Sequence, residues 1–523
     1  MSKFAVMKFS TILTSAALAA SLVLGGAPLN TAEAKGSYST SASTSAFTNP
    51  KREFRGAWLH VIGQSQWQNK STEQAKEYIR QQLDRLVDAG CNAVIFQVRP
   101  TADALYISEL EPWSAWLTGK RGKAPSPMWD PMAYAIDEAH KRGLEFHAWL
   151  NPYRVTSSAK DVLPASHDAN KEPHRFVKFN GQTFFDPAYQ ENRDFICRII
   201  DDITTRYDVD AIHIDDYFYP YPAGGKKFDA DAASYAKFGN GMSKSDWRRH
   251  NVDLLIEQIH KTIKSRKPWV RFGVSPFGIW RNKSSDPRGS ASSGLQNYDD
   301  LYADVLLWAK KGWIDYMAPQ LYWNLDTRAA PSRSLAKWWN DNANGVDVYI
   351  GQDVKRTMDV ADPGNHDRNE LDTKVKLSRQ LPNVQGNVWW HGYWVTGNYK
   401  GALDSLALKY QSTIALPPAY GDKNVKPKAP DGIHLERRGG KTFLTWHAPA
   451  TGTTQKATDA VRFVVYQFFK GEKPDIDDPQ TIIALTPHTS VLVNDDDLKG
   501  QTFYVTSLDR MNRESLPAVY TVK

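Results

Sequence analysis

Eight short apolar segments, separated by stretches with helical periodicity, repeat between residues 53 and 395 of the chain. Parallel strands that alternate with helices in this way close into a barrel when there are eight units. An open doubly wound sheet is the alternative, but no glycine-rich phosphate turn follows the first segment, which disfavours it. The predicted fold class is therefore α/β, a (β/α)8 TIM barrel. The predicted strands are 56–62, 92–98, 144–151, 210–215, 270–277, 314–323, 346–353 and 387–394.

Composition divides the chain into five predicted parts. Residues 1–34 combine lysines, an apolar run and an A-x-A site, as a secretory signal peptide does, and the Ser/Thr-rich residues 35–51 are predicted to be a flexible linker. Residues 52–415 hold the barrel. A Pro/Gly/Lys-rich linker, 416–430, follows it. Residues 431–523 contain short alternating strands around a central tryptophan, a pattern typical of a small all-β sandwich.

Charge and leader together suggest where the protein acts. The formal net charge is +7 and the pI about 9.0, but the basic residues are spread along the chain, so we expect attraction to an anionic cell wall and no nucleic-acid binding. No lipoprotein cysteine directly follows the apolar run and no later segment is apolar over 18 residues, so we expect a secreted or wall-associated protein without a membrane span after signal removal. Cys91 and Cys197 are interpreted as buried free thiols, although a bridge stays possible.

The segment DAIHIDDYFYP, residues 210–220, is the strongest functional signal. A buried strand ends there in two adjacent carboxylates, Asp215 and Asp216, followed by aromatic residues. Buried acids are costly unless they are paired or functional, and acids beside aromatic faces at a barrel strand's carboxyl end suit sugar cleavage. Because Ile212 and Ile214 should face the helices, Asp215 should point into the barrel mouth. Asp215 is predicted to be the principal catalytic carboxylate, with Asp216 as its neighbour or substitute.

General acid catalysis requires a second carboxylate with a raised pKa. Glu111 is the predicted candidate, because the neighbouring Trp113 could provide an apolar wall. Asp103 lies on the same loop as Arg99, which should lower its pKa and favour a structural pair. Asp216 and Asp353 are the remaining candidates.

Other polar and aromatic residues at strand ends are predicted to bind sugar hydroxyls or to stack on pyranose rings. No HxH or HExxH spacing supports a metal, and no G-x-S-x-G elbow or phosphate loop is present, so neither a metal nor a cofactor is predicted. The predicted substrate-binding residues are Trp58, Arg99, Asp103, His147, Asn151, Tyr153, His213, Tyr217, Gln320, Tyr322, Trp323, Trp390 and His391.

Long motifs in the first 395 residues resemble the glycosyl hydrolase-like 10 family. They are REFRGAWLHV, FQVRPTADALY, EPWSAWLTG, DEAHKRGLEFHAWLNPYRV, DAIHIDDYFYP, DWRRHNV, FGVSPFGIW and IDYMAPQLYW. The resemblance implies a TIM-barrel glycosidase domain, often followed by a fibronectin type III-like sandwich. It also implies an exported protein that acts on peptidoglycan glycan strands, which one branch cleaves after removal of their stem peptides. By position, Asp215 and Asp216 match the family's fourth-strand motif, and Arg99, Asn151 and Gln320 match other strand ends.

Three functions remain open at this point. The leading hypothesis is an exported glycoside hydrolase whose partner is a cell-wall polysaccharide. The alternative is a non-catalytic or weakly catalytic wall glycan-binding protein, and a third is an exported α-glucan hydrolase. A second carboxylate within about 5–10 Å of Asp215 would favour hydrolysis.

Overall fold

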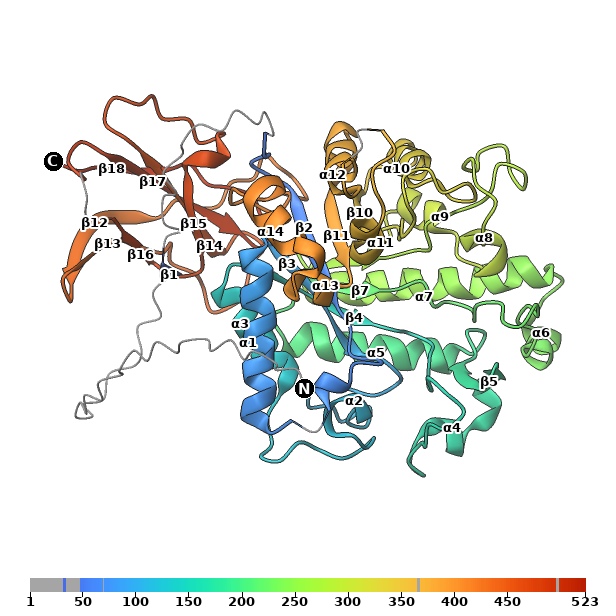
Figure 1. Cartoon of the computed structure of the whole chain (residues 1–523). Helices are drawn as coiled ribbons and strands as arrows, with labels where there is room; N and C mark the ends of the chain where they lie inside the picture. The colour runs from blue at the N-terminus through green and yellow to red at the C-terminus, as the bar shows by residue number, and fades with distance from the viewer. Residues whose placement is uncertain (1–31, 34–47, 69, 365–366, 495–497) are drawn as a thin grey trace, which may run out of the picture.

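The computed structural model describes residues 32–33, 48–68, 70–364, 367–494 and 498–523 (Figure 1). The predicted signal peptide and most of the predicted linker at 35–51 lie outside the described residues; Ala32–Glu33 forms strand β1. Among the described residues, no helix has the length and apolar character needed to cross a bilayer. Asn49 is already packed, because its side-chain amide donates to the Ser412 hydroxyl at 2.9 Å.

The predicted barrel is confirmed: eight parallel strands form a closed ring. All eight strands differ from the predicted bounds by at least one residue, and two of these differences have a local cause. The predicted strand 314–323 is shortened to Tyr316–Met317, because Pro319 cannot donate a ladder hydrogen bond. The last strand begins at Val384, and the end of the predicted segment turns into helix α13, Gly392–Thr396. The barrel strands are β2 Phe54–Leu59, β3 Ala93–Arg99, β4 Glu145–Leu150, β7 Ala211–Ile214, β8 Arg271–Val274, β9 Tyr316–Met317, β10 Asp347–Asp353 and β11 Val384–Trp390.

Helices surround the barrel, and their ends follow local sequence. Helix α1, Thr72–Asp88, begins in a capping box at Ser71. It ends before Gly90, whose φ of +78° is left-handed and whose Cβ position lies 2.4 Å from the Gln411 carbonyl oxygen, so no larger residue fits. The other outer helices are α3 Pro131–Lys141, α5 Gln190–Arg206, α7 Lys244–Arg266, α9 Val305–Lys310, α10 Ser332–Asp341, α11 Val354–Asp359, α12 Leu371–Gln380 and α14 Ala402–Ser405.

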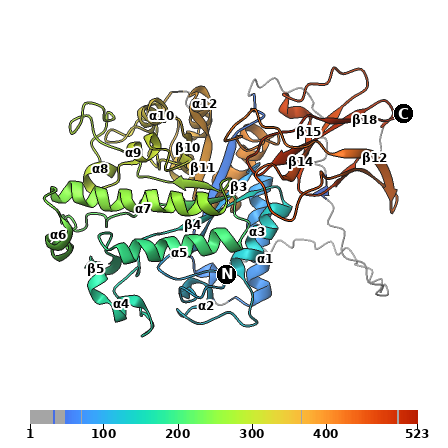
Figure 2. The ribbon, with the colours of Figure 1, turned by 180° about the vertical axis from the view of Figure 1, so that it is seen from behind.

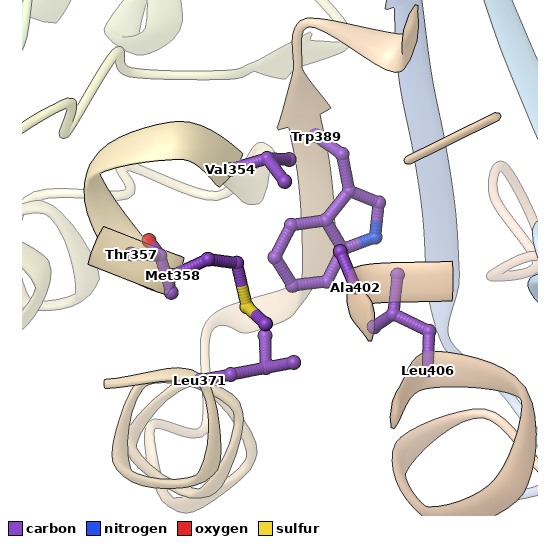
Figure 3. Close-up of a pocket in the computed structure, with 7 residues that line it drawn as sticks. All are labelled: Val354, Thr357, Met358, Leu371, Trp389, Ala402 and Leu406. Carbon is purple, nitrogen blue, oxygen red and sulfur yellow. The ribbon is translucent and has the colours of Figure 1, made fainter. Parts of the chain in front are cut away.

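Side chains alternate between the barrel interior and the helix layer, as strand geometry requires. Ile212 and Ile214 pack in the core between strands and helices, as predicted, whereas Phe54 and Tyr316 fill the interior. Cys91 and Cys197 are both buried and are not joined by a disulfide, which confirms that they are separate thiols. A small apolar cavity lies between β11 and the helices that cover it (Figure 3). It is lined by Val354, Thr357, Met358, Leu371, Trp389, Ala402 and Leu406, and contains no group suited to chemistry.

The predicted sandwich is also confirmed and lies at one end of the barrel (Figure 2). Trp446 packs against Phe463 in its core. One sheet has the strand order β1-β16-β13-β12 and the other β15-β14-β17-β18. The strands are β12 Asp431–Arg438, β13 Lys441–His447, β14 Ala460–Phe468, β15 Ile482–Thr486, β16 Ser490–Val493, β17 Thr502–Asp509 and β18 Ala518–Thr521.

The sandwich closes the amino-terminal end of the barrel. Asn512, beyond β17, donates its side-chain amide to Glu145 Oε1 at 2.8 Å, and the other oxygen of Glu145 lies 2.5 Å from Arg271. Tyr420, in the connecting segment, donates to the main-chain carbonyls of Trp269 and Arg510. Burial favours the neutral form of Glu145, but the Arg271 charge, the His147 hydrogen bond and the Arg462 charge together outweigh burial and hold the pKa of Glu145 below its usual value.

We predict that Glu145→Gln will lower the free energy of unfolding by about 3–5 kcal/mol, because Arg271 would remain charged and buried without its partner. Urea denaturation followed by tryptophan fluorescence measures this loss. Asp477→Asn is the control: its side chain is 87% exposed beside Lys51, so its effect should stay within about 0.5 kcal/mol. Equal unfolding curves for the two variants would contradict a stabilising role for the Glu145–Arg271 pair.

Candidate active site

The candidate site lies at the carboxyl ends of the strands, at the opposite end of the barrel from the sandwich (Figure 1). Asp215 follows β7 and, as predicted, points into the mouth. Its carboxylate accepts hydrogen bonds from Trp149 Nε1 at 3.1 Å and from Asn151 Nδ2 at 3.0 Å, and from the Tyr217 main-chain N–H at 3.3 Å. Burial raises the pKa of Asp215, while the Arg154 charge and these hydrogen bonds oppose the rise. This carboxylate is oriented on several sides.

Asp216 occupies a different environment. Its carboxylate accepts a hydrogen bond from the Tyr221 hydroxyl and lies beside the Gln320 amide. Burial and then the neighbouring charge of Asp215 raise the pKa of Asp216 to about 6. When two adjacent acids interact, the acid that is harder to ionise keeps its proton to higher pH. Burial and the Asp215 charge therefore favour a proton on Asp216.

Aromatic rings surround the two acids, and all of them are half-buried except Trp58, which is buried. Tyr322 and Trp390 stack with centroids 5.8 Å apart, and Trp58 meets both edge-on at 6.3 Å. Tyr221, which donates to Asp216, has its ring 5.3 Å from that of Tyr217. Phe277 links the Tyr221 ring to Trp323. Such a rim gives flat apolar surfaces next to hydrogen-bonding acids, the combination that a pyranose ring requires.

Glu111 is placed differently from its prediction. Both of its oxygens pair with the Arg99 guanidinium, at 2.6 and 2.7 Å, and the two side chains are buried. Arg99 also donates to the main-chain carbonyl of Asn151. An acid fixed in this way has no free oxygen for a leaving group, so Glu111 and Arg99 hold the loop that carries Asn151.

Asp103 corrects a second expectation. Its nearest cation is Arg121, at 3.8 Å, and its carboxylate accepts from Thr101. The predicted partner, Arg99, is instead paired with Glu111. Burial raises the pKa of Asp103, opposite to the predicted direction. Asp103 has no exposed surface, so its position does not support a substrate contact.

Three further predicted ligands also lie out of reach. Tyr153 has no exposed surface and packs among the outer core residues. His147 and His213 are equally buried, and both contact the Tyr316 hydroxyl in the barrel interior, at 2.8 and 2.9 Å. They lie beneath the site. At the rim, His391 is half-buried and stacks on Trp394, so it remains a candidate contact.

The prediction missed three residues that the structure brings to the acids: Trp149, Arg154 and Tyr221. Strand alternation could have identified Trp149, which shares an inward face with Asn151. Arg154 and Tyr221 lie in loops, where no periodicity indicates direction. Asp353, at the end of β10, caps α11 by accepting from the Arg356 main-chain N–H at 2.8 Å. Among the described residues, no group of three potential ligands is arranged to hold a metal ion.

Comparison with known proteins places this site in a family. Residues 53–369 match the family model described as glycosyl hydrolase-like 10. The chain belongs to the glycosyl hydrolase-like 10 family. It is 39% identical over 506 residues to glycosyl hydrolase YngK of Bacillus subtilis, covering 93% of this chain and 97% of that protein. It is 38% identical over 364 residues to glycosyl hydrolase DigH of Escherichia coli K12, covering 64% of this chain and 82% of that protein.

The solved structures with similar barrels share less sequence with this chain than YngK and DigH do. The catalytic domain of β-amylase from Paenibacillus polymyxa gives a TM-score of 0.45 at 11% identity, covering 70% of this chain and 99% of that chain. The PgaB (BpsB) glycoside hydrolase domain from Bordetella bronchiseptica gives a TM-score of 0.42 at 12% identity, covering 69% and 99%. The glycosyl hydrolase-like 10 assignment, which makes the chain a glycosidase, rests on the family match and the closer relatives.

We predict a bell-shaped pH dependence of kcat/KM for this glycosidase. Activity should rise with pH as Asp215 loses its proton and fall above about pH 6, because Asp216 then loses the proton that it must donate. In Tyr221→Phe, the ionised form of Asp216 loses a hydrogen bond, so its pKa rises and the alkaline limb should move up by about one pH unit.

Tyr235→Phe is the matched control for that measurement. Its hydroxyl donates to the main-chain carbonyl of Met242, at 2.6 Å, and faces no catalytic acid. An alkaline limb that stays in place in Tyr221→Phe, as in the control, would remove Asp216 as the group that sets it.

Proposed function

We propose that this protein is an exported glycoside hydrolase, secreted or held at the cell wall, that hydrolyses peptidoglycan glycan strands after their stem peptides have been removed. The observation that carries the proposal is the pair of buried acids inside an aromatic mouth. Asp215 is held by three donors and Asp216 has a pKa of about 6. The family match supplies the reaction class.

The proposed chemistry divides the work between the two acids. Asp216, protonated below about pH 6, donates its proton to the glycosidic oxygen as the bond to the anomeric carbon breaks. Asp215 supplies a negative charge to the positive anomeric carbon, as nucleophile or as electrostatic stabiliser. Water then adds to that carbon, and its proton returns to Asp216. Trp149 and Asn151 keep Asp215 oriented throughout.

The proposed substrate and location follow from separate features. The leader-like residues 1–34 support export, and the formal net charge of +7 suits an anionic wall. The resemblance of the strand-end motifs supports peptidoglycan glycan as the polymer. The stacked Tyr322 and Trp390 would provide a platform for its pyranose rings.

We expect the purified protein to release soluble sugar from peptide-stripped glycan strands, and Asp215→Asn to lower the rate at least about a thousandfold. Intact peptidoglycan and a soluble α-glucan serve as parallel substrates, and products are followed by chromatography and mass spectrometry. Asp253→Asn is the matched control. Asp253 is a half-buried acid that accepts from Trp308 Nε1 at 2.6 Å, as Asp215 does from Trp149, but on the outer helix α7.

The outcomes separate the competing functions. Release by the wild type and the control variant, but not by Asp215→Asn, supports the proposal. Retention on the glycan without release would instead indicate a wall-binding protein. Cleavage of the α-glucan alone would identify the third hypothesis and reject peptidoglycan as the substrate.

A further inference from the structure

A polar hollow of about 220 Å³ opens beside the two acids. Its walls come from the β5–β6 hairpin, formed by Phe176–Phe179 and Gln182–Phe185, and from the loop that follows β7. Tyr217 and Tyr221 belong both to this hollow and to the surroundings of Asp216. A substrate bound at the acids would therefore extend a substituent into it. The residues that matter for its chemistry are Arg154, Asn180, Gln182, Tyr217 and Tyr221.

Arg154 is the one charged residue among those that line the hollow. It is 8% exposed, and its guanidinium lies 4.5 Å from the centre of the Tyr217 ring. Within the described part of the chain, no carboxylate lies within 4.0 Å of this guanidinium, although the Asp215 charge is near enough to be affected by it. A largely buried arginine without an ion-pair partner favours an anion supplied from outside.

The position of Arg154 is fixed relative to the reacting groups. Its main-chain N–H donates to Asn151 Oδ1 at 2.8 Å, while the Asn151 amide donates to Asp215 at 3.0 Å. The main chain of Arg154 also forms an isolated antiparallel β-bridge with Phe184 in the hairpin. A carboxylate paired with Arg154 would therefore be held at a set distance from the bond under attack.

The charges around the acids also favour a cation at the position of Arg154. Asp215 and Asp216 would repel an acidic sugar, and a cation beside them offsets that repulsion. The guanidinium also presents a planar set of donors that matches the two oxygens of a carboxylate.

We propose that this hollow is a subsite for a free carboxylate on the sugar next to the cleaved bond, and that Arg154 is the residue that selects it. The inference rests on the proposed function. In that function the carboxylate belongs to the lactyl group of muramic acid and becomes free when the stem peptide is removed. An amide at that carboxyl removes the charge that Arg154 recognises. A uronic acid offers the same chemistry from another source.

Binding of single sugars tests the subsite without any need for cleavage. Isothermal titration at pH 7 would compare N-acetylmuramic acid with its methylamide and with glucuronic acid. The wild type should bind the free acid about tenfold or more tightly than the amide. Arg154→Gln should abolish the preference and Arg154→Lys should keep part of it. Arg249→Gln, an arginine stacked at 4.0 Å over Tyr298 on the outer surface, should behave as the wild type.

Kinetic measurements on longer substrates are a second test of the subsite. Peptide-stripped strands would be compared with the same strands after their carboxyls are converted to methylamides. The wild type should show a tenfold or greater advantage in kcat/KM for the free-acid strands, and Arg154→Gln should show none.

Each result has a defined meaning. Equal wild-type affinity for N-acetylmuramic acid and its amide overturns the subsite even if both strands are cut. Selective binding of the acid with neither strand cut upholds the subsite and rejects the proposed function. Preference for glucuronic acid over N-acetylmuramic acid upholds the carboxylate site and overturns muramic acid as its source.

Discussion

The buried ion pair between Glu145 of β4 and Arg271 of β8 supports the interior of the barrel, and the sandwich contacts it through Asn512. Such a pair is unfavourable unless every remaining lone pair and proton finds a partner. Asn512 of the sandwich satisfies the second oxygen of Glu145, and the Tyr349 hydroxyl accepts from Arg271 at 2.9 Å. The sandwich therefore supplies the second partner of Glu145, while the Arg271 Nε is buried without a hydrogen bond.

From that floor a chain of hydrogen bonds continues toward the mouth. His147 contacts Glu145 at 3.3 Å and the Tyr316 hydroxyl at 2.8 Å, and the same hydroxyl lies 2.9 Å from His213. Trp58 donates to His213 at 3.3 Å and forms part of the aromatic rim. Packed and hydrogen-bonded side chains thus fill the interior beneath the acids. Asp215 and Asp216 are buried above this interior, and burial raises the pKa of both.

The sequence patterns that could be interpreted correctly are those with a period. Alternation along residues 211–217 places Ile212 outward and Asp215 inward because strand geometry leaves no other arrangement. The partner of Arg99 could not be deduced in the same way. Asp103 and Glu111 lie four and twelve residues away, and only the path of the loop decides between them. The contact between Asn512 and Glu145 spans 367 residues and leaves no local signal.

Asn151 shows why catalysis and substrate selection are coupled in this site. Its main-chain carbonyl accepts from Arg99, which Glu111 fixes in turn; its side-chain oxygen accepts from the Arg154 main-chain N–H, and its amide donates to Asp215. One residue therefore sets the position of Asp215 and of the main chain that carries Arg154 beside the neighbouring hollow. A shift of this loop would displace both together, since the same side chain bonds to each. Precise placement of the reacting carboxylate thus imposes equally precise placement of the residue proposed to recognise the sugar.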